Sequence, residues 1–107
     1  MTSFAAAAPF VLADAPSRGV IVAKYFRGLG DPTRLQILRL LDREGELAAG
    51  ELVRHIGLPQ ATVSTHLGCL RWCGFVSTRR EQRSVIYRLA DPLVSELVTL
   101  AEALLED

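Results

Sequence analysis

The sequence has few cysteines, no long hydrophobic run and no excess of either charge. Its 107 residues include only two cysteines, which argues against a small secreted domain held together by disulfide bonds. The longest unbroken apolar run falls far short of the roughly 20 residues that a membrane-spanning helix needs. We therefore expect a protein that has no membrane partner.

The first residues of the chain differ in composition from the rest. Residues 1–17 are rich in Ala and Pro, which predicts a flexible arm. They also contain a short apolar stretch, but no basic residue precedes it and Asp14 interrupts it, so we do not expect a secretory signal. Residues 18–107 are long enough for one domain with a modest core. We expect the protein to be cytoplasmic.

The balanced net charge hides a segregation of charges along the chain. Twelve basic and twelve acidic side chains cancel overall, yet residues 54–88 hold six arginines against the single acid Glu81. Residues 91–107 hold five acids and no base. A basic middle segment beside an acidic end predicts one face that binds polyanions and another that does not.

Apolar periodicity and capping residues predict five helices and one hairpin. Asp31 and Asp91 each precede a proline, the favoured start of a helix, and Gly45, Gly57 and Gly74 are positioned to end helices. Two β-prone runs flank a polar loop over residues 79–84, which predicts a hairpin. The expected helices span 20–28, 32–44, 49–56, 59–73 and 92–105, and the expected strands span 75–78 and 85–89.

The first and last predicted helices are apolar on more than one face. In a small protein, terminal helices of this kind usually pack against a partner chain. We therefore predict a homodimer whose interface includes Tyr25, Phe26, Leu93, Leu97, Leu100 and Leu104.

The order helix–helix–turn–helix–hairpin is typical of a winged helix-turn-helix. This is a mainly α fold with a β-hairpin wing, here in the order α-α-α-α-β-β-α. On a helical wheel, Val63, Leu67 and Leu70 of the fourth helix face the core, so its polar side chains face outward. In this fold that helix reads the major groove of double-stranded DNA, and basic residues of the wing contact phosphates. The predicted DNA contacts come from Gln60, Thr62, Ser64, Thr65, His66 and Arg71 on the helix, and from Arg79, Arg80 and Arg83 on the wing.

Two residues of the fourth helix have a competing prediction. His66 fits helix packing as well as a phosphate contact. Trp72 faces outward on the wheel, where packing on the wing or on a partner chain is an alternative to a DNA contact.

Three segments of the chain resemble a known family. They are GLGDPTRLQILRLL (28–41), ELVRHIGLPQATVSTHLGCLRWCGFV (51–76) and RREQRSVIYRL (79–89). Through them the chain resembles the ArsR/SmtB family of metal-responsive winged-helix repressors. The resemblance implies a homodimer that binds an operator of dyad symmetry and represses transcription until an inducer binds.

Two metal sites known in that family are absent from this sequence. A thiol site at the third helix would need cysteines where residues 46–52 read ELAAGEL, and a site on the last helix would need histidines where Leu93 and Leu104 stand. What remains is Cys69 and Cys73, which resemble the recognition-helix cysteine pair of the cadmium- and lead-sensing branch. Thiolates four residues apart share one helix face and favour soft cations. The predicted inducer is a thiophilic metal ion: cadmium or lead, with zinc, mercury or arsenite as alternatives.

The cysteine pair leaves the ligand set open. The related site is completed by a further cysteine from the other subunit, and this sequence has no third cysteine. Two thiolates alone suit linear Hg²⁺ coordination. On the wheel both thiols are semi-buried, on the flank of the helix near its DNA-facing surface. A third ligand would have to be His66, water, a small thiol, or the partner's Glu102, Glu106 or Asp107.

Other functions compete with metal sensing. The two cysteines could be ordinary buried apolar residues, or they could respond to thiol oxidation or reactive sulfur. A winged helix can also be a module that binds protein rather than DNA. The sequence contains no nucleophile–base pair and no phosphate-binding loop, so we do not expect an enzyme.

Overall fold

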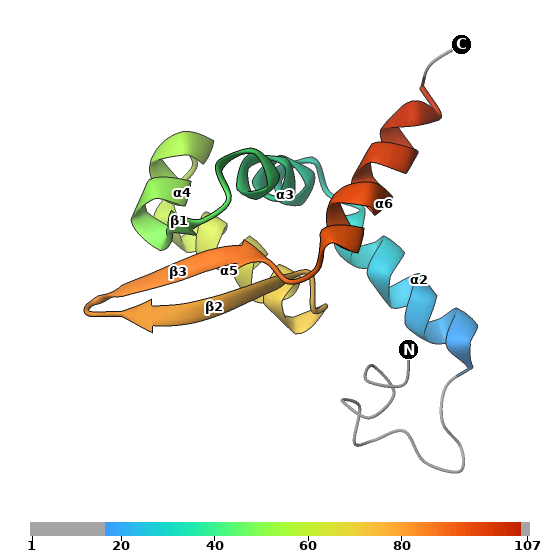
Figure 1. Cartoon of the computed structure of the whole chain (residues 1–107), viewed down its shortest axis with the longest axis horizontal. Coiled ribbons are helices and arrows are strands. Elements are labelled where there is room, and N and C mark those ends of the chain that lie inside the picture. The colour runs from blue at the N-terminus through green and yellow to red at the C-terminus, as the bar shows by residue number, and fades with distance from the viewer. Residues whose placement is uncertain (1–16, 106–107) are drawn as a thin grey trace.

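The computed structural model describes residues 17–105, which form five helices and three strands (Figure 1). The predicted arm lies outside the described residues except for Ser17, whose side chain caps the first helix. In chain order the elements are α2 (Arg18–Leu29), α3 (Pro32–Glu44), β1 (Leu47–Ala48), α4 (Ala49–Ile56), α5 (Gln60–Trp72), β2 (Val76–Glu81), β3 (Ser84–Leu89) and α6 (Pro92–Ala103). The winged helix-turn-helix fold predicted from the sequence is confirmed.

Capping residues begin and end the helices where the sequence predicts. Asp31 Oδ1 accepts hydrogen bonds from the backbone N–H groups of Thr33 (2.8 Å) and Arg34 (3.1 Å) at the start of α3. Asp91 Oδ1 accepts one from the N–H of Leu93 (2.8 Å) at the start of α6. The first-turn N–H groups of a helix have no partner within the helix, so these carboxylates stabilise both starts. At the turn between α4 and α5, Gly57 adopts φ +77°, a conformation that favours glycine.

The wing is a longer hairpin than the sequence predicts. β2 and β3 pair antiparallel from Val76 opposite Leu89 to Glu81 opposite Ser84. The prediction of a polar loop over residues 79–84 is therefore wrong, because Arg79 and Arg80 are strand residues and only residues 82–83 form the turn. Arg79 pairs with Ile86 and Arg80 with Val85. These β-branched partners favour an extended backbone, and pairing with them extends the strand through the two polar arginines.

A short strand that the sequence analysis missed ties the wing to the helices. Leu47 pairs with Tyr87 and Ala48 with Ile86, which gives a sheet in the order β1-β3-β2. β1 directly precedes α4, so it anchors β3 against the helix-turn-helix. A strand of two residues is too short to show an alternation of apolar and polar side chains. Only its hydrogen-bonded pairing with β3 defines it as a strand.

The core lies where α3, α4 and α5 meet the sheet. Val63, Leu67 and Leu70 of α5 are buried, as predicted. α2 and α6 both pack against α3, at the end of the molecule opposite the wing tip (Figure 1). Within residues 17–105, no helix is long and apolar enough to span a membrane. The buried side chains are Ile37, Leu38, Leu40, Leu41, Leu47, Leu52, Val63, Leu67, Leu70, Cys73, Phe75, Val76, Val94 and Val98.

Candidate DNA interface and cysteine site

The amino-terminal half of α5 presents short polar side chains to solvent. Gln60, Thr62, Ser64 and Thr65 are all exposed, whereas Val63 between them is buried. The hydroxyl of Thr65 donates a hydrogen bond to the carbonyl of Ala61 (3.0 Å), which leaves its oxygen free to accept. Short donors and acceptors on an exposed helix face can approach base edges in a major groove. All four predicted residues are therefore accessible at the amino-terminal half of α5.

His66 faces a different way from these residues. Its ring is half-buried, and its Nδ1 lies 3.3 Å from Nη1 of Arg34 and 3.9 Å from Oδ1 of Asp31 at the start of α3. The ring thus takes part in helix packing, which was the competing prediction, and its contact with a phosphate stays a prediction. Arg71, by contrast, is exposed near the end of α5.

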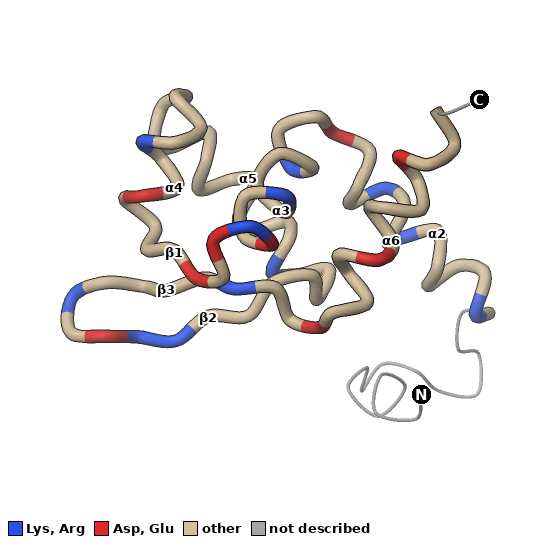
Figure 2. Tube along the Cα trace, turned by 45° about the horizontal axis from the view of Figure 1, so that its top comes forward, with Lys and Arg blue, Asp and Glu red and all other residues tan. Residues whose placement is uncertain are grey.

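The three wing arginines have unequal surroundings. Arg79 Nη1 lies 2.8 Å from Oε2 of Glu46, and its Nη2 lies 3.2 Å from Oε2 of Glu81. The hydrogen bond from Arg79 lowers the pKa of Glu46, so the pair is charged at neutral pH. Arg80 and Arg83 are exposed and form no ion pair with the described residues. Figure 2 shows basic residues gathered near the wing tip, with acidic sequence between them.

The two cysteines lie together at the carboxyl end of α5. Cys69 is half-buried, whereas Cys73 is only 4% exposed and belongs to the core. The sequence-based expectation of two semi-buried thiols is therefore wrong for Cys73. It caps the end of the helix, and a Cβ built on Gly28 of α2 would lie 2.7 Å from its Sγ. The thiol thus rests directly against the backbone of α2.

Burial raises the pKa of the Cys73 thiol above its ordinary value. The neighbouring Cys69 adds to this shift through its charge and through a side-chain hydrogen bond, while the positive charges of Lys24 and Arg34 oppose it. Cys73 is therefore protonated at neutral pH.

The described residues offer no third donor beside the two thiols. No group of three or more His, Cys, Asp or Glu side chains that could hold a metal ion occurs in this part of the chain. His66 is directed toward Arg34, and Glu102 forms an ion pair with Arg39. The two other acids considered as ligands, residues 106 and 107, lie outside the described residues. Two soft sulfur donors fit a two-coordinate thiophilic ion, or a larger one completed from elsewhere.

Trp72 packs on a side chain of α2. The ammonium of Lys24 lies 3.9 Å from the centroid of the indole ring, close enough for a cation–π interaction. The ring remains 71% exposed. Trp72 therefore adds a contact between α2 and α5 on the surface, beside the buried contact of Cys73.

The predicted dimer residues are mostly exposed. Phe26 of α2, and Leu93, Leu100 and Leu104 at α6, are large apolar side chains that face solvent. Tyr25 and Leu97 are half-buried against the core, and the Tyr25 ring lies 5.6 Å from that of Phe75. These two residues thus contribute to packing within one chain.

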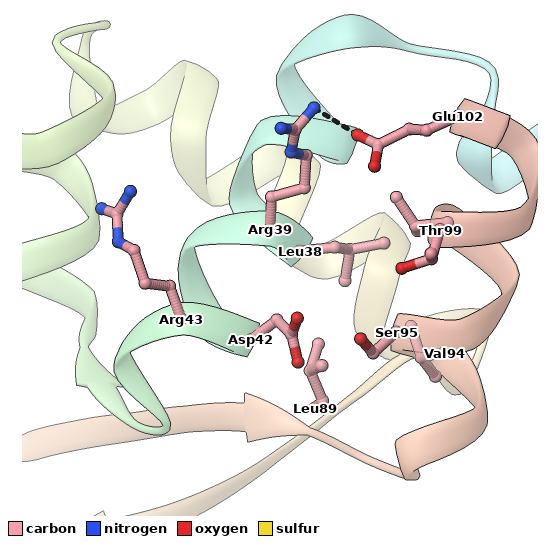
Figure 3. A pocket seen from close by; sticks show the side chains of 10 residues that line it. Leu38, Arg39, Asp42, Arg43, Leu89, Val94, Ser95, Thr99 and Glu102 are labelled. Atoms are coloured by element: carbon pink, nitrogen blue, oxygen red, sulfur yellow. Dashed lines mark ion pairs between the residues drawn. The ribbon is translucent and has the colours of Figure 1, made fainter. Parts of the chain in front are cut away.

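A pocket of about 270 Å³ lies between α3 and α6 (Figure 3). Its lining includes the apolar Leu38 and Val94, with Thr99 and the Arg39–Glu102 ion pair at its polar side. None of its lining residues belongs to α5. It is separate from both the cysteine pair and the DNA-facing surface.

Three residues that shape the cysteine site were not found from the sequence: Gly28, Lys24 and Arg34. The GDPTR stretch signalled a helix start, but nothing local indicates that Arg34 reaches α2 and α5. Only the arrangement of the three helices makes these residues neighbours.

The fold, the exposed polar face of α5 and the arginines of the wing define a winged helix-turn-helix domain of the DNA-binding class. The pattern of the bacterial regulatory protein arsR family matches residues 31–78. The chain is 47% identical over 85 residues to a probable mercury resistance operon repressor from Streptomyces lividans, covering 79% of this chain and 67% of that protein. The chain belongs to the arsR family.

Two further likenesses agree with this assignment. The transcriptional regulator CmtR from Mycobacterium tuberculosis is 49% identical over 71 residues, which cover 65% of this chain and 58% of that protein. A homodimeric winged helix-turn-helix DNA-binding domain from Mycobacterium bovis superimposes with a TM-score of 0.75 at 31% identity, covering 89% of this chain and 91% of that chain. The matched proteins are regulators of transcription, and the predicted family and fold are confirmed.

Proposed function

We propose that this protein is a homodimeric transcriptional repressor that leaves its operator when a thiophilic metal ion binds Cys69 and Cys73. The observation that carries the proposal is the position of the two thiols. They lie side by side at the end of the helix whose other half presents polar side chains to solvent, and Cys73 also touches α2. Metal capture there acts on the recognition helix itself.

Operator binding would use α5 and the wing. The exposed side chains Gln60, Thr62, Ser64 and Thr65 face the major groove, and Arg71, Arg80 and Arg83 contact phosphates. Arg79 contributes less, because its charge is already paired with Glu46 and Glu81. Two copies related by a twofold axis would read the two halves of a symmetric operator.

Mercury(II) is the metal that the donor set favours most. A two-thiolate site satisfies its preference for linear coordination, and the described residues supply no third donor. A relative 47% identical to this chain is described as a probable repressor of a mercury resistance operon. Cadmium, lead, zinc and arsenite would each need at least one further donor, from the partner chain, a small thiol or water.

Thiol oxidation is the alternative trigger for the same cysteines. It would require a reactive thiolate, and the raised pKa of Cys73 keeps that thiol protonated at neutral pH. A metal ion can displace the proton of a thiol as it binds, whereas an oxidant reacts with a thiolate that is already present. A Cys73 thiol that stays protonated at neutral pH therefore favours the metal as the trigger.

The test is a titration of the reduced protein with HgCl₂, CdCl₂, Pb²⁺ and arsenite, followed by the ultraviolet thiolate-to-metal absorption band. The same samples are then titrated with a dyad-symmetric duplex that the wild-type protein selects from a random library. We expect a saturable band and an operator affinity that falls by about 5- to 150-fold, the usual range of allosteric coupling.

The matched control is the double variant Cys69→Ser/Cys73→Ala, in which alanine keeps the buried position apolar. It should bind the duplex and show neither band nor release. If no metal changes the wild-type affinity while hydrogen peroxide or a persulfide does, the trigger is oxidation and the metal proposal fails.

A further inference from the structure

Arg34 joins three helices at one point. It lies in the first turn of α3, and its Nε donates a hydrogen bond to the carbonyl of Gly28 (2.6 Å) and its Nη2 to that of Arg27 (3.2 Å). Both carbonyls belong to the carboxyl end of α2. The remaining nitrogen, Nη1, lies 3.3 Å from Nδ1 of His66 on α5. Because a guanidinium group only donates, a hydrogen bond at this contact requires Nδ1 to accept.

The cysteine site touches the same piece of backbone. Cys73 Sγ rests against the Cα of Gly28, so closely that a Cβ there would lie 2.7 Å away. The carbonyl of Gly28 is the acceptor for Arg34 Nε. A change in the position of Sγ, such as a rotation toward Cys69 to share a metal ion, therefore acts on backbone that Arg34 holds.

These contacts form a chain of residues that joins the carboxyl end of α5 to its middle. It runs from Cys73 to Gly28 on α2, from Gly28 to Arg34 on α3, and from Arg34 to His66, which lies in the middle of α5. His66 directly follows Thr65, one of the exposed polar residues. The end of the helix that holds the thiols is thus linked through other helices to the part that faces DNA.

We propose that Arg34 is the positioning residue through which the cysteine site sets the orientation of the recognition helix α5. The inference rests on the proposed function. Without metal, Arg34 holds α2 and α5 in the arrangement that binds the operator. Metal capture displaces Gly28 from Cys73, the bonds of Arg34 to α2 and His66 rearrange together, and α5 tilts away from its DNA-binding orientation.

The planar guanidinium is essential to this role. It reaches three acceptors on two helices at once, whereas the compact ammonium group of lysine cannot reproduce that fork. A residue with only a structural role would, when replaced, weaken DNA binding equally with and without metal. A coupling residue would instead change the ratio of the two operator affinities.

The experiment compares Arg34→Lys with wild type. For each protein we would measure the dissociation constant of the selected duplex without metal and with saturating HgCl₂, and take the ratio. We expect Arg34→Lys to bind mercury with the wild-type absorption band but to show a ratio at least about fivefold smaller. By reciprocity, the ratio of the mercury affinities of the free and the DNA-bound protein would fall by the same factor.

Arg39→Lys is the matched control. Arg39 lies on the same helix and pairs with Glu102 of α6, so its replacement should leave the ratio unchanged. Two variants of His66 test the contact between Arg34 and α5. His66→Asn keeps an acceptor near the position of Nδ1 and should retain the ratio of operator affinities. His66→Leu removes the acceptor and should lower the ratio.

The outcomes separate the two proposals. If Arg34→Lys binds mercury and keeps the wild-type ratio, the inference about Arg34 is overturned and the proposed function stands. If wild type itself shows no band or a ratio of one, the proposed function fails first. Should circular dichroism show that Arg34→Lys does not fold, the His66 pair decides: equal ratios in its two variants overturn the inference.

Discussion

Two glycines inside helices have opposite surroundings. A Cβ added at Gly68, on the exposed side of α5, would meet nothing within 4 Å, whereas one at Gly28 would lie 2.7 Å from Cys73 Sγ and 3.1 Å from Phe75 Cε2. Glycine within a helix costs roughly 0.5–1 kcal/mol relative to alanine. Gly28 therefore has a packing reason to be glycine, whereas the described residues give Gly68 none.

We expect Gly68→Ala to raise the free energy of unfolding by about 0.5–1 kcal/mol. Gly28→Ala should lower it by about 1–3 kcal/mol, because buried atoms must move to admit the methyl group. Urea denaturation followed by circular dichroism measures both. Equal effects of the two substitutions would contradict the packing described for Gly28. A weaker affinity of the stabilised Gly68→Ala for the duplex would indicate that DNA approaches α5 closely at this position.

The buried thiol makes metal capture depend on pH. Burial and Cys69 raise the pKa of Cys73, so the thiol keeps its proton up to a pH above the ordinary range of cysteine. A metal ion must displace that proton, and the apparent affinity should therefore rise with pH by about tenfold per unit for each proton released. Competition with a chelator between about pH 6 and pH 8.5 measures the slope. Cys73→Ala should reduce the slope by one proton, and a flat wild-type profile would show that no thiol proton is displaced.

At the scale of the element, the wing offers a matched pair of neighbouring arginines. Arg80 forms no ion pair with the described residues, whereas Arg79 is paired with Glu46 and Glu81. We expect Arg80→Gln to weaken binding of the duplex by about threefold to tenfold and to reduce the slope of log K against log salt by about one. Arg79→Gln should change both quantities less. Fluorescence anisotropy at several salt concentrations measures the affinity and its salt dependence. A larger effect of Arg79→Gln than of Arg80→Gln would show that Arg79, and not Arg80, is the main phosphate contact.

The helices and the sheet differ in how far local sequence predicts them. Asp31, Asp91 and the glycines that follow helices are local signals, so the starts of α3 and α6 and the order of the helices follow from the sequence, whereas α2 begins two residues earlier than predicted and α6 ends two residues earlier. β1 exists only because Leu47 meets Tyr87, forty residues further along the chain, and the strand character of Arg79 comes from its partner on β3. Pairing of this kind is not visible in a window of neighbouring residues.

The candidate site shows the same division. The exposed face of α5 is a property of one helix, so the helical wheel predicts it. The burial of Cys73 depends on the room that Gly28 leaves on another helix, and the contacts of Arg34 depend on where α2 and α5 lie. A wheel describes one helix at a time and cannot include a neighbour.

At the scale of the whole molecule, the apolar surfaces of α2 and α6 imply association. We expect Leu100→Glu to weaken the dimer by at least about tenfold, because a symmetric interface carries each substitution twice and a buried leucine contributes about 1.5–3 kcal/mol. Sedimentation equilibrium measures the dissociation constant. Thr99→Glu adds the same charge at the α3-facing pocket and should leave the dimer intact. Loss of the dimer in both variants would mean that charge alone, and not the apolar contact, decides association.

The contact between Lys24 and Trp72 gives the protein an optical probe of its own. Trp72 is the only tryptophan in the chain, its ring is stacked under an ammonium group of α2, and the next residue is Cys73. Indole emission responds to nearby charge, heavy atoms and solvent. A metal ion bound beside the ring should quench it, whereas DNA on α5 should shift its wavelength. Both binding events can thus be followed in one unlabelled sample, and their order resolved by stopped-flow fluorescence.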